Sequence, residues 1–195
     1  MIYSDWPEVM AKRDAELKAV LNKDSVIWEV GGYLGDWAQY ASDMFGSQIH
    51  VYEPVFHSKI YTGTGNVFIH TYGLERADYK TRFFINKDAT GLYELKTKGK
   101  HEIDVLLVDV LTEIKNFERV DFVQLNCECG EYGILDRLLE CPDELKKIKR
   151  LRVQFHKHPI IPENKRDYLI EALQKLGYIS VYSIPYYWEE WELSE

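Results

Sequence analysis

The chain lacks the features of secreted and membrane-embedded proteins. It has three cysteines among 195 residues, and this small, odd number does not favour a disulfide framework. No stretch is long and apolar enough to span a bilayer, and the first residues do not have the basic and then apolar order of a secretory leader. We therefore expect a cytoplasmic protein that does not interact with membranes.

Basic residues are scarce relative to acidic ones. The chain has 24 Lys and Arg against 32 Asp and Glu, a formal net charge of -8, which repels phosphate backbones and makes nucleic acid an unfavourable partner. Hydrophobic residues make up 46% and charged residues 29%, as in soluble globular domains. We expect a single domain over residues 1–195 with a core that needs no disulfides, and the sequence does not indicate an oligomeric state.

Segments typical of strands and helices alternate along the chain. A capping box at Asp5-Trp6-Pro7-Glu8 begins an N-terminal helix to about Leu21, and residues 1–24 are expected to pack on the domain. Further helices are expected after Gly35 and around 134–139 and 168–176. Strands are expected at 26–30, 49–53, 66–70, 103–108, 120–125, 151–155 and 178–184, with an inserted strand and loop at 83–91. This order predicts an α/β fold with a mostly parallel, Rossmann-like sheet and helices on both faces.

A glycine turn after the first expected strand is the most informative motif. It reads Glu29-x-Gly31-x-x-x-Gly35, and Glu53 ends the next strand. Without a Cβ at Gly31 a ligand can lie against the turn, and the following helix offers free amides. Glu53, beside the turn in a parallel sheet, can accept hydrogen bonds from two ribose hydroxyls. The G-x-G-x-x-G pattern of dinucleotide sites is absent, which favours an adenosyl ligand without a pyrophosphate. The alternative is a turn that only connects a strand to a helix.

Three runs of sequence together resemble the FkbM family of methyltransferases. They are IWEVGGYLGD at 27–36, VYEP at 51–54 and DFVQLNCECGE at 121–131, and the resemblance extends over nearly the whole chain. It implies a class I methyltransferase fold, S-adenosylmethionine as the cofactor, and O-methylation of a hydroxyl on a small molecule or saccharide. The expected cofactor contacts are Glu29, Gly31, Gly32, Tyr33, Gly35, Glu53, Pro54, Tyr72, Gly73 and Asn126.

Three departures from the family pattern affect the expected chemistry. Asn126 stands where the family has Asp, Cys129 where it has Gly, and Gln154 where it commonly has Glu. An amide forms hydrogen bonds but does not take a proton. An adenosyl-binding protein without turnover is therefore an alternative to the enzyme, whereas a nucleotide-dependent oxidoreductase is disfavoured by the missing dinucleotide motif.

A hydroxyl acceptor needs a base, and Glu128 and His156 are the candidate catalytic residues. Both follow expected strands at the carboxyl edge of the sheet, where ligands bind in open α/β folds. Each also has a structural interpretation: Glu128 as a carboxylate that stabilises a helix dipole, and His156 as a histidine with only structural partners. Glu131 is expected to be a capping charge in the first helical turn. The aromatic tail at 185–191 is expected to be an edge strand rather than a wall of the acceptor site.

A zinc site is the remaining alternative. Cys127-x-Cys129 and His156-x-His158 follow strands that would be neighbours, and the period of two puts each pair on one face. Four such ligands suit tetrahedral zinc. Because such short spacings also arise by chance, we expect no bound metal.

Overall fold

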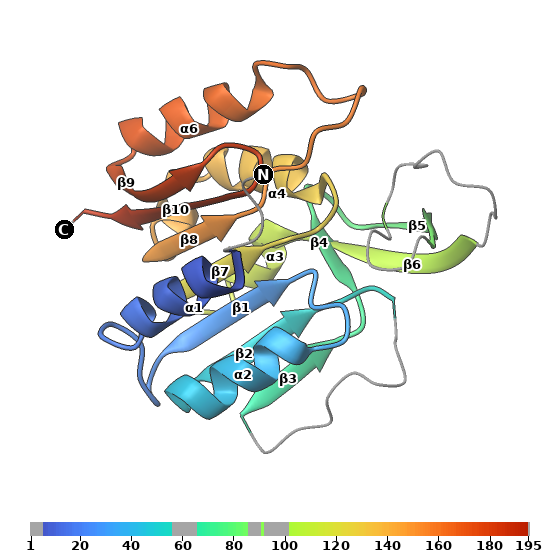
Figure 1. Ribbon diagram of the computed structural model, residues 1–195. Helices are drawn as coiled ribbons and strands as arrows, with labels where there is room; N and C mark the ends of the chain where they lie inside the picture. Colours follow the sequence, from blue (N-terminus) through green and yellow to red (C-terminus); the bar gives the residue numbers. More distant parts are fainter. Residues whose placement is uncertain (1–5, 56–65, 86–90, 92–101, 195) are drawn as a thin grey trace.

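A seven-stranded sheet forms the centre of the computed structural model, which describes residues 6–55, 66–85, 91 and 102–194 (Figure 1). Its strand order is β3-β2-β1-β7-β8-β10-β9, and only β10 is antiparallel to its neighbours. The prediction of a mostly parallel α/β sheet is therefore confirmed. The strands are β1 (Val26–Val30), β2 (Gln48–Tyr52), β3 (Val67–His70), β7 (Phe122–Leu125), β8 (Arg150–Val153), β9 (Tyr178–Ile184) and β10 (Trp188–Leu193).

Helices cover both faces of this sheet, and β1 shows why. Its alternate side chains enter different clusters: Ile27 packs with Ala38 of α2, and Trp28 with Leu135 of α4. A strand that is apolar on both faces is typical of the centre of a parallel sheet. Residues of α1 (Trp6–Leu17) and α2 (Asp36–Phe45) contribute to the first cluster, and those of α3 (Val110–Ile114), α4 (Gly130–Leu139), α5 (Pro142–Leu145) and α6 (Lys165–Lys175) to the second.

Buried ion pairs connect helix α1 to the sheet. Arg152 of β8 donates from Nη1 to Asp14 of α1 at 2.6 Å and from Nε to Glu190 of β10 at 2.9 Å. Removing one partner of such a buried ion pair leaves the other charge buried and uncompensated. The helix ends at Leu17 rather than at Leu21.

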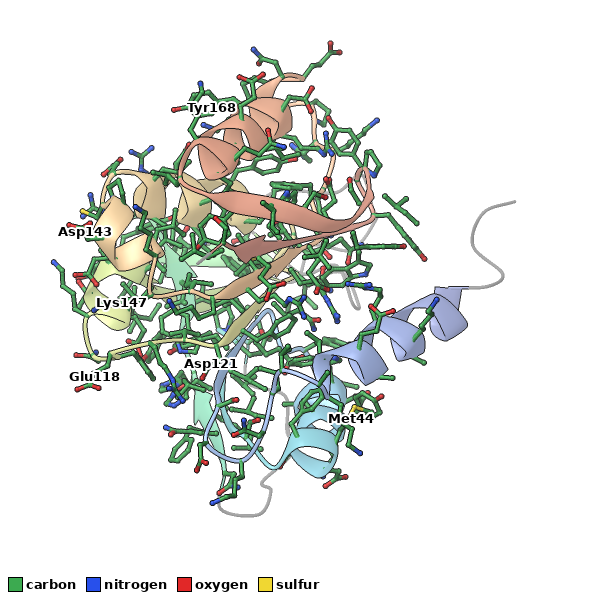
Figure 2. The ribbon with its side chains drawn as sticks, turned by 90° about the vertical axis from the view of Figure 1, so that its left-hand side faces the viewer. Met44, Glu118, Asp121, Asp143, Lys147 and Tyr168 are labelled. Atoms are coloured by element: carbon green, nitrogen blue, oxygen red, sulfur yellow. The ribbon has the colours of Figure 1, made fainter. Side chains whose placement is uncertain are left out.

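Two large apolar residues within the expected helix ranges face solvent. Val20 lies beyond the end of α1 and is 50% exposed. Tyr168 is 57% exposed and points outward from α6 in Figure 2, whereas Leu169 and Leu173 of the same helix are buried. Helix α6 packs on α4 and β9, and Leu169 and Leu173 supply its buried side chains.

A second, three-stranded sheet stands beside the carboxyl ends of the main strands. It has the order β4-β6-β5, with β4 (Gly73–Glu75), β5 (Tyr79–Phe84) and β6 (Glu102–Asp109). The strand expected at 103–108 therefore exists but pairs outside the main sheet. Gly91 pairs with Phe84, and an added Cβ on Gly91 would lie 3.0 Å from Cβ of Glu128. This sheet thus approaches the end of β7. Residues 88–90 of the expected loop lie outside the described residues.

The aromatic tail does not form an edge strand. A turn at 185–187 reverses the chain, and β10 inserts between β8 and β9, where Trp188 and Trp191 are buried. The expectation of an edge strand is wrong because the hairpin places the earlier strand, β9, at the edge. Within the described residues no helix is long and apolar enough to cross a membrane.

Candidate functional site

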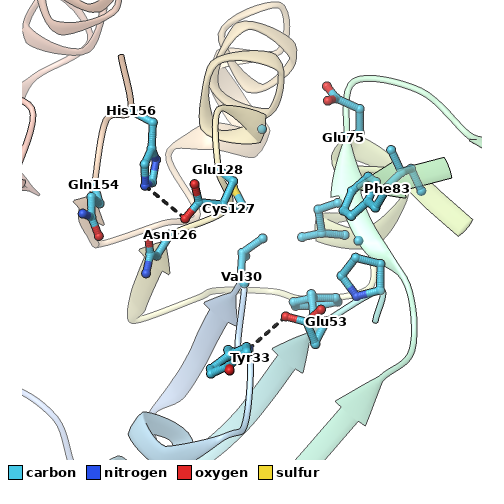
Figure 3. Close-up of a pocket in the computed structure, with 17 residues that line it drawn as sticks. Val30, Tyr33, Glu53, Glu75, Phe83, Asn126, Cys127, Glu128, Gln154 and His156 are labelled. Atoms are coloured by element: carbon cyan, nitrogen blue, oxygen red, sulfur yellow. Dashed lines mark hydrogen bonds and ion pairs between the residues drawn. The ribbon is translucent and has the colours of Figure 1, made fainter. Parts of the chain in front are cut away.

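A cavity of about 350 Å³ opens at the carboxyl ends of β1, β2 and β7, and the second sheet forms its opposite wall (Figure 3). This edge is where ligands bind in open α/β sheets, and the volume is in the range of small-molecule sites. Most of the expected site residues line it. They are Gly31, Tyr33, Glu53, Pro54, Gly73, Asn126, Glu128 and His156, joined by Val30, Tyr52, Leu74, Glu75, Phe83, Leu107, Cys127, Gly130 and Gln154.

The glycine turn is required for a different reason from the one expected. Gly31 has φ of +86°, and a Cβ there would lie 1.9 Å from the main-chain oxygen of Asn126. The missing side chain therefore lets the end of β1 pack against the end of β7, instead of only making room for a ligand. Gly35, with φ of +79°, is the N-cap residue just before α2 and lines neither this cavity nor the two described below.

Glu53 is held by the backbone. Its Oε2 accepts from the amide of Tyr33 at 2.9 Å, and its Oε1 accepts from the amide of Val55 at 2.9 Å. Burial raises the pKa of Glu53, while these two amides act in the opposite direction. Because a carboxylate has about four lone-pair sites, both oxygens retain capacity for hydroxyl donors in the cavity.

Glu29 lies on the other side of the turn, in a second cavity of about 330 Å³ that shares Gly31, Tyr33 and Asn126 with the first and also contains Gly32. Oε2 of Glu29 and Oδ1 of Asn126 are buried and have no hydrogen-bond partner among the described residues. Burial, followed by the charge of Glu53, raises the pKa of Glu29. Buried acceptors without a partner are costly, so these two oxygens are suited to receive donors from a ligand.

Tyr72 does not enter either cavity. Its hydroxyl donates to Oε2 of Glu113 at 3.1 Å and lies 3.1 Å from Nδ1 of His70. Tyr52, which does line the first cavity, donates to Oε1 of Glu113 at 3.0 Å. Tyr72 therefore supports the wall of the cavity from behind and is not placed to contact a ligand there.

On the opposite side of the first cavity, two carboxylates enclose His156. Glu131 is fully buried, and its Oε1 accepts from the main-chain N of His156 at 2.7 Å and lies 3.1 Å from Nδ1. Oε1 of Glu128 lies 3.4 Å from Nε2 (Figure 3). Glu131 is thus a buried connection between α4 and the end of β8, and the expectation of a capping charge is wrong because the side chain turns inward.

Charge and backbone strain both mark this part of the site. Burial lowers the pKa of His156, but the hydrogen bond and charge of Glu131 together with the charge of Glu128 outweigh it and raise the pKa overall. Glu128 and Cys129 have φ of +49° and +76°, left-handed values that cost energy in residues with a Cβ. Such strain tends to concentrate at functional sites.

The four residues considered for zinc do not converge. Sγ of Cys127 donates to Glu131 and Sγ of Cys129 to the carbonyl of His156, each at 3.9 Å. His158 accepts from the amide of Ile160 through Nδ1 and lies in a different cavity. In the part of the chain that the structure describes, no three His, Cys, Asp or Glu residues are arranged to hold a metal ion.

Glu75 is a cavity residue that the sequence analysis missed. It is buried on β4, and burial raises its pKa. A Cβ on Gly133, in the middle of α4, would lie 1.9 Å from Oε1 of Glu75. A glycine inside a helix is a signal of close approach, and Gly133 was the one indication available that another side chain packs against α4.

A third cavity, of about 540 Å³, adjoins the first at His156. Tyr132 of α4, the loop after β8 and Tyr186 of the β9–β10 turn line it. The ammonium of Lys157 lies 4.1 Å from the centre of the Tyr186 ring. Part of the aromatic tail therefore does line a cavity, although β10 itself is an interior strand.

Comparison with known proteins identifies the fold. No family model matches the sequence, and no curated protein matches it. The methyltransferase FkbM from Methylobacillus flagellatus KT superposes with a TM-score of 0.57 and 12% identity over 88% of this chain and 44% of that one. TrmK of M. capricolum, in complex with S-adenosylhomocysteine, gives a TM-score of 0.48 with 14% identity over 94% and 68% of the two chains. The α/β fold is that of class I methyltransferases, and the chain spans less than half the length of the FkbM structure.

Proposed function

We propose that the protein is a cytoplasmic S-adenosylmethionine-dependent methyltransferase, related to FkbM, that methylates a hydroxyl of a small molecule or saccharide. The observation that carries this proposal is the carboxyl-edge cavity in which Glu53 is anchored by two backbone amides beside the glycine turn. The class I methyltransferase fold supports it.

The hydrogen-bond acceptors of the site fit this cofactor. Glu53 is suited to accept from two ribose hydroxyls. Asn126, which lines both the first and the second cavity, and Glu29, which lines the second, supply buried oxygens without hydrogen-bond partners among the described residues. An elongated ligand with a nucleoside at one end and a cationic amino-acid group at the other would therefore satisfy both cavities. When bound, the cofactor supplies an electrophilic methyl group on a sulfonium.

The chain's own residues would align the acceptor and receive its proton. Alignment alone contributes roughly 7–11 kcal/mol in well-oriented systems. Glu128, which lines the first cavity, and His156, which lines both the first and the third, are the proton-handling groups. We place the acceptor in the third cavity, against Tyr132 and Tyr186. The approach of Gly91 to Glu128 helps to exclude water.

A binding protein without turnover is the second candidate. It is favoured by the amides of Asn126 and Gln154, which line the cavity in place of the family's carboxylates. The two functions share the cofactor and differ only in chemistry.

Titration of the purified protein with S-adenosylmethionine, S-adenosylhomocysteine and NAD tests the cofactor. We expect the two adenosyl ligands to bind and NAD not to bind. Glu53→Ala should weaken S-adenosylhomocysteine by about 10- to 150-fold, because a hydrogen bond to a charged group contributes about 1.5–3 kcal/mol. Glu118→Ala, which removes an exposed acid that lines none of the three cavities, is the control. Unchanged affinity in Glu53→Ala would remove Glu53 from the site.

A homocysteine-release assay over hydroxylated sugars and metabolites then separates the two candidates. Turnover with any acceptor supports the enzyme. Tight binding of S-adenosylhomocysteine without turnover across the panel supports the binding protein.

A further inference from the structure

Glu131 is the least exposed carboxylate near the cavity, yet it does not line the cavity. Among the described residues it contacts His156 and Cys127: Oε1 accepts from the main-chain N of His156 and lies near Nδ1 of the same residue, and Oε2 accepts from Sγ of Cys127. Because the same oxygen of Glu131 contacts both the main-chain N and Nδ1 of His156, the imidazole ring is fixed relative to its own backbone. Glu131 therefore sets the direction of the other ring nitrogen.

That other nitrogen, Nε2, faces Oε1 of Glu128 at 3.4 Å. We propose that Glu131 is a positioning residue: it holds the imidazolium of His156 through Nδ1, so that Nε2–H keeps the carboxylate of Glu128 ionised and directed into the cavity. This proposal rests on the proposed methyl transfer for its chemical consequence, but the orientation of His156 is measurable without an acceptor.

Two other described partners of His156 contact its main chain rather than its ring. Sγ of Cys129, which precedes α4, and the hydroxyl of Tyr132 in α4 donate to its main-chain carbonyl. A hydrogen bond with the backbone of Gln154, the residue after β8, also raises the pKa of His156. Lys157 on the following loop has its ammonium over the ring of Tyr186. The two glutamates are thus the dominant partners.

The proton balance of the transfer follows from this arrangement. The acceptor oxygen forms a bond to the methyl carbon as the bond from that carbon to sulfur breaks and leaves its electron pair on sulfur. The hydroxyl proton passes to Glu128, which can release it to solvent afterwards. His156 keeps its own proton throughout, and Glu131 keeps its hydrogen bonds.

Nitrogen NMR of ¹⁵N-histidine-labelled protein tests the positioning. In the wild type we expect His156 to have a pKa above its ordinary value and, once neutral at high pH, to retain its proton on Nδ1. Glu131→Gln preserves an oxygen acceptor but removes the charge, and it should shift the pKa of His156 downward. Glu113→Gln removes another buried carboxylate, one that accepts from Tyr52 and Tyr72, and should leave the His156 titration unchanged.

Two outcomes would overturn the proposal. One is a neutral His156 in the wild type with its proton on Nε2, a measurement that does not depend on whether any variant folds. The other is a folded Glu131→Gln protein whose His156 titrates as in the wild type.

Once an acceptor is known, the alkaline limb of the pH–rate profile should move to lower pH in Glu131→Gln. Failure to bind S-adenosylhomocysteine would instead contradict the proposed function and leave the NMR result standing.

Discussion

The two sides of the first cavity hold their carboxylates by different means. At the ends of β1 and β2, Glu53 accepts from backbone amides, and Glu29 lies with an unpartnered oxygen. At the ends of β7 and β8, Glu128 and Glu131 enclose the imidazole of His156. Backbone amides fix a carboxylate without adding a titratable partner, whereas an imidazole couples the carboxylates to pH.

This difference separates ligand holding from proton handling. The β1–β2 side presents acceptors for donor groups of a ligand, and the two backbone amides that hold Glu53 do not titrate. The β7–β8 side contains a proton whose position depends on three side chains. Changes on one side should therefore alter binding, and changes on the other should alter turnover and its pH dependence.

The largest effect is expected from Glu128→Gln. Loss of the group that receives the acceptor's proton should slow turnover by roughly 10²–10⁴-fold and leave the affinity for S-adenosylhomocysteine nearly intact. Steady-state rates and calorimetry on the same preparation measure both quantities. Unchanged turnover would assign Glu128 to the helix dipole alone and move attention to His156→Ala.

The glycine turn joins the two sides, and Gly31→Ala should damage both. The added Cβ would overlap the main-chain oxygen of Asn126, and φ of +86° is unfavourable for alanine. Overpacking and backbone strain together predict a loss of about 2–4 kcal/mol in the free energy of unfolding. Urea denaturation measures this loss. The control for strain alone is Gly46→Ala, which is also at positive φ but whose added Cβ would lie 3.8 Å from Cβ of Lys23, an ordinary contact.

A histidine pair behind the β1–β2 side gives a smaller, pH-dependent effect. His50 Nδ1 lies 3.0 Å from His70 Nε2, and burial, followed by the charge of His70, lowers the pKa of His50 from 6.5 to about 4. Between pH 6.5 and pH 4 the unfolded chain binds more protons at this histidine than the folded protein does. The contribution of His50 to the free energy of unfolding is therefore fully present above pH 6.5 and is lost as the pH falls toward 4.

The size of that effect is limited by the remaining hydration of the ring. A full shift is worth about 1.4 kcal/mol per pKa unit, and partial hydration reduces the expected loss to about 2 kcal/mol. The free energy of unfolding is measured at pH 7 and pH 4.5 for the wild type and for His50→Asn. The difference between the two proteins in their pH dependence gives the effect of His50, because the titration of carboxylates common to both cancels. Equal pH slopes would show that His50 is not responsible.

The β1–β2 side was predictable from sequence and the β7–β8 side only in part. Glu53 was predictable because a parallel strand that follows a glycine turn must end beside it. The burial of Glu131 was not, since its position in the first turn of α4 is equally suited to an exposed cap. Glu75 was missed because β4 pairs with β6 in a separate sheet, an arrangement that depends on long-range contacts which no local pattern encodes.

The smallest effect should come from metal removal. Zinc binding requires deprotonated thiols, and burial together with neighbouring carboxylates raises the pKa of Cys127 and brings that of Cys129 to about 12. Each thiol also already donates to an oxygen. We therefore expect elemental analysis to find no stoichiometric zinc, and EDTA to leave the melting temperature unchanged. A chelator would also fail to remove zinc from a very tight site, so the Cys127→Ser, Cys129→Ser double variant completes the test. One zinc per wild-type chain that is absent from this variant would contradict the prediction. Such a result would place a second charged centre on the β7–β8 side, where the pKa of His156 would then be set by the metal as well as by the two glutamates.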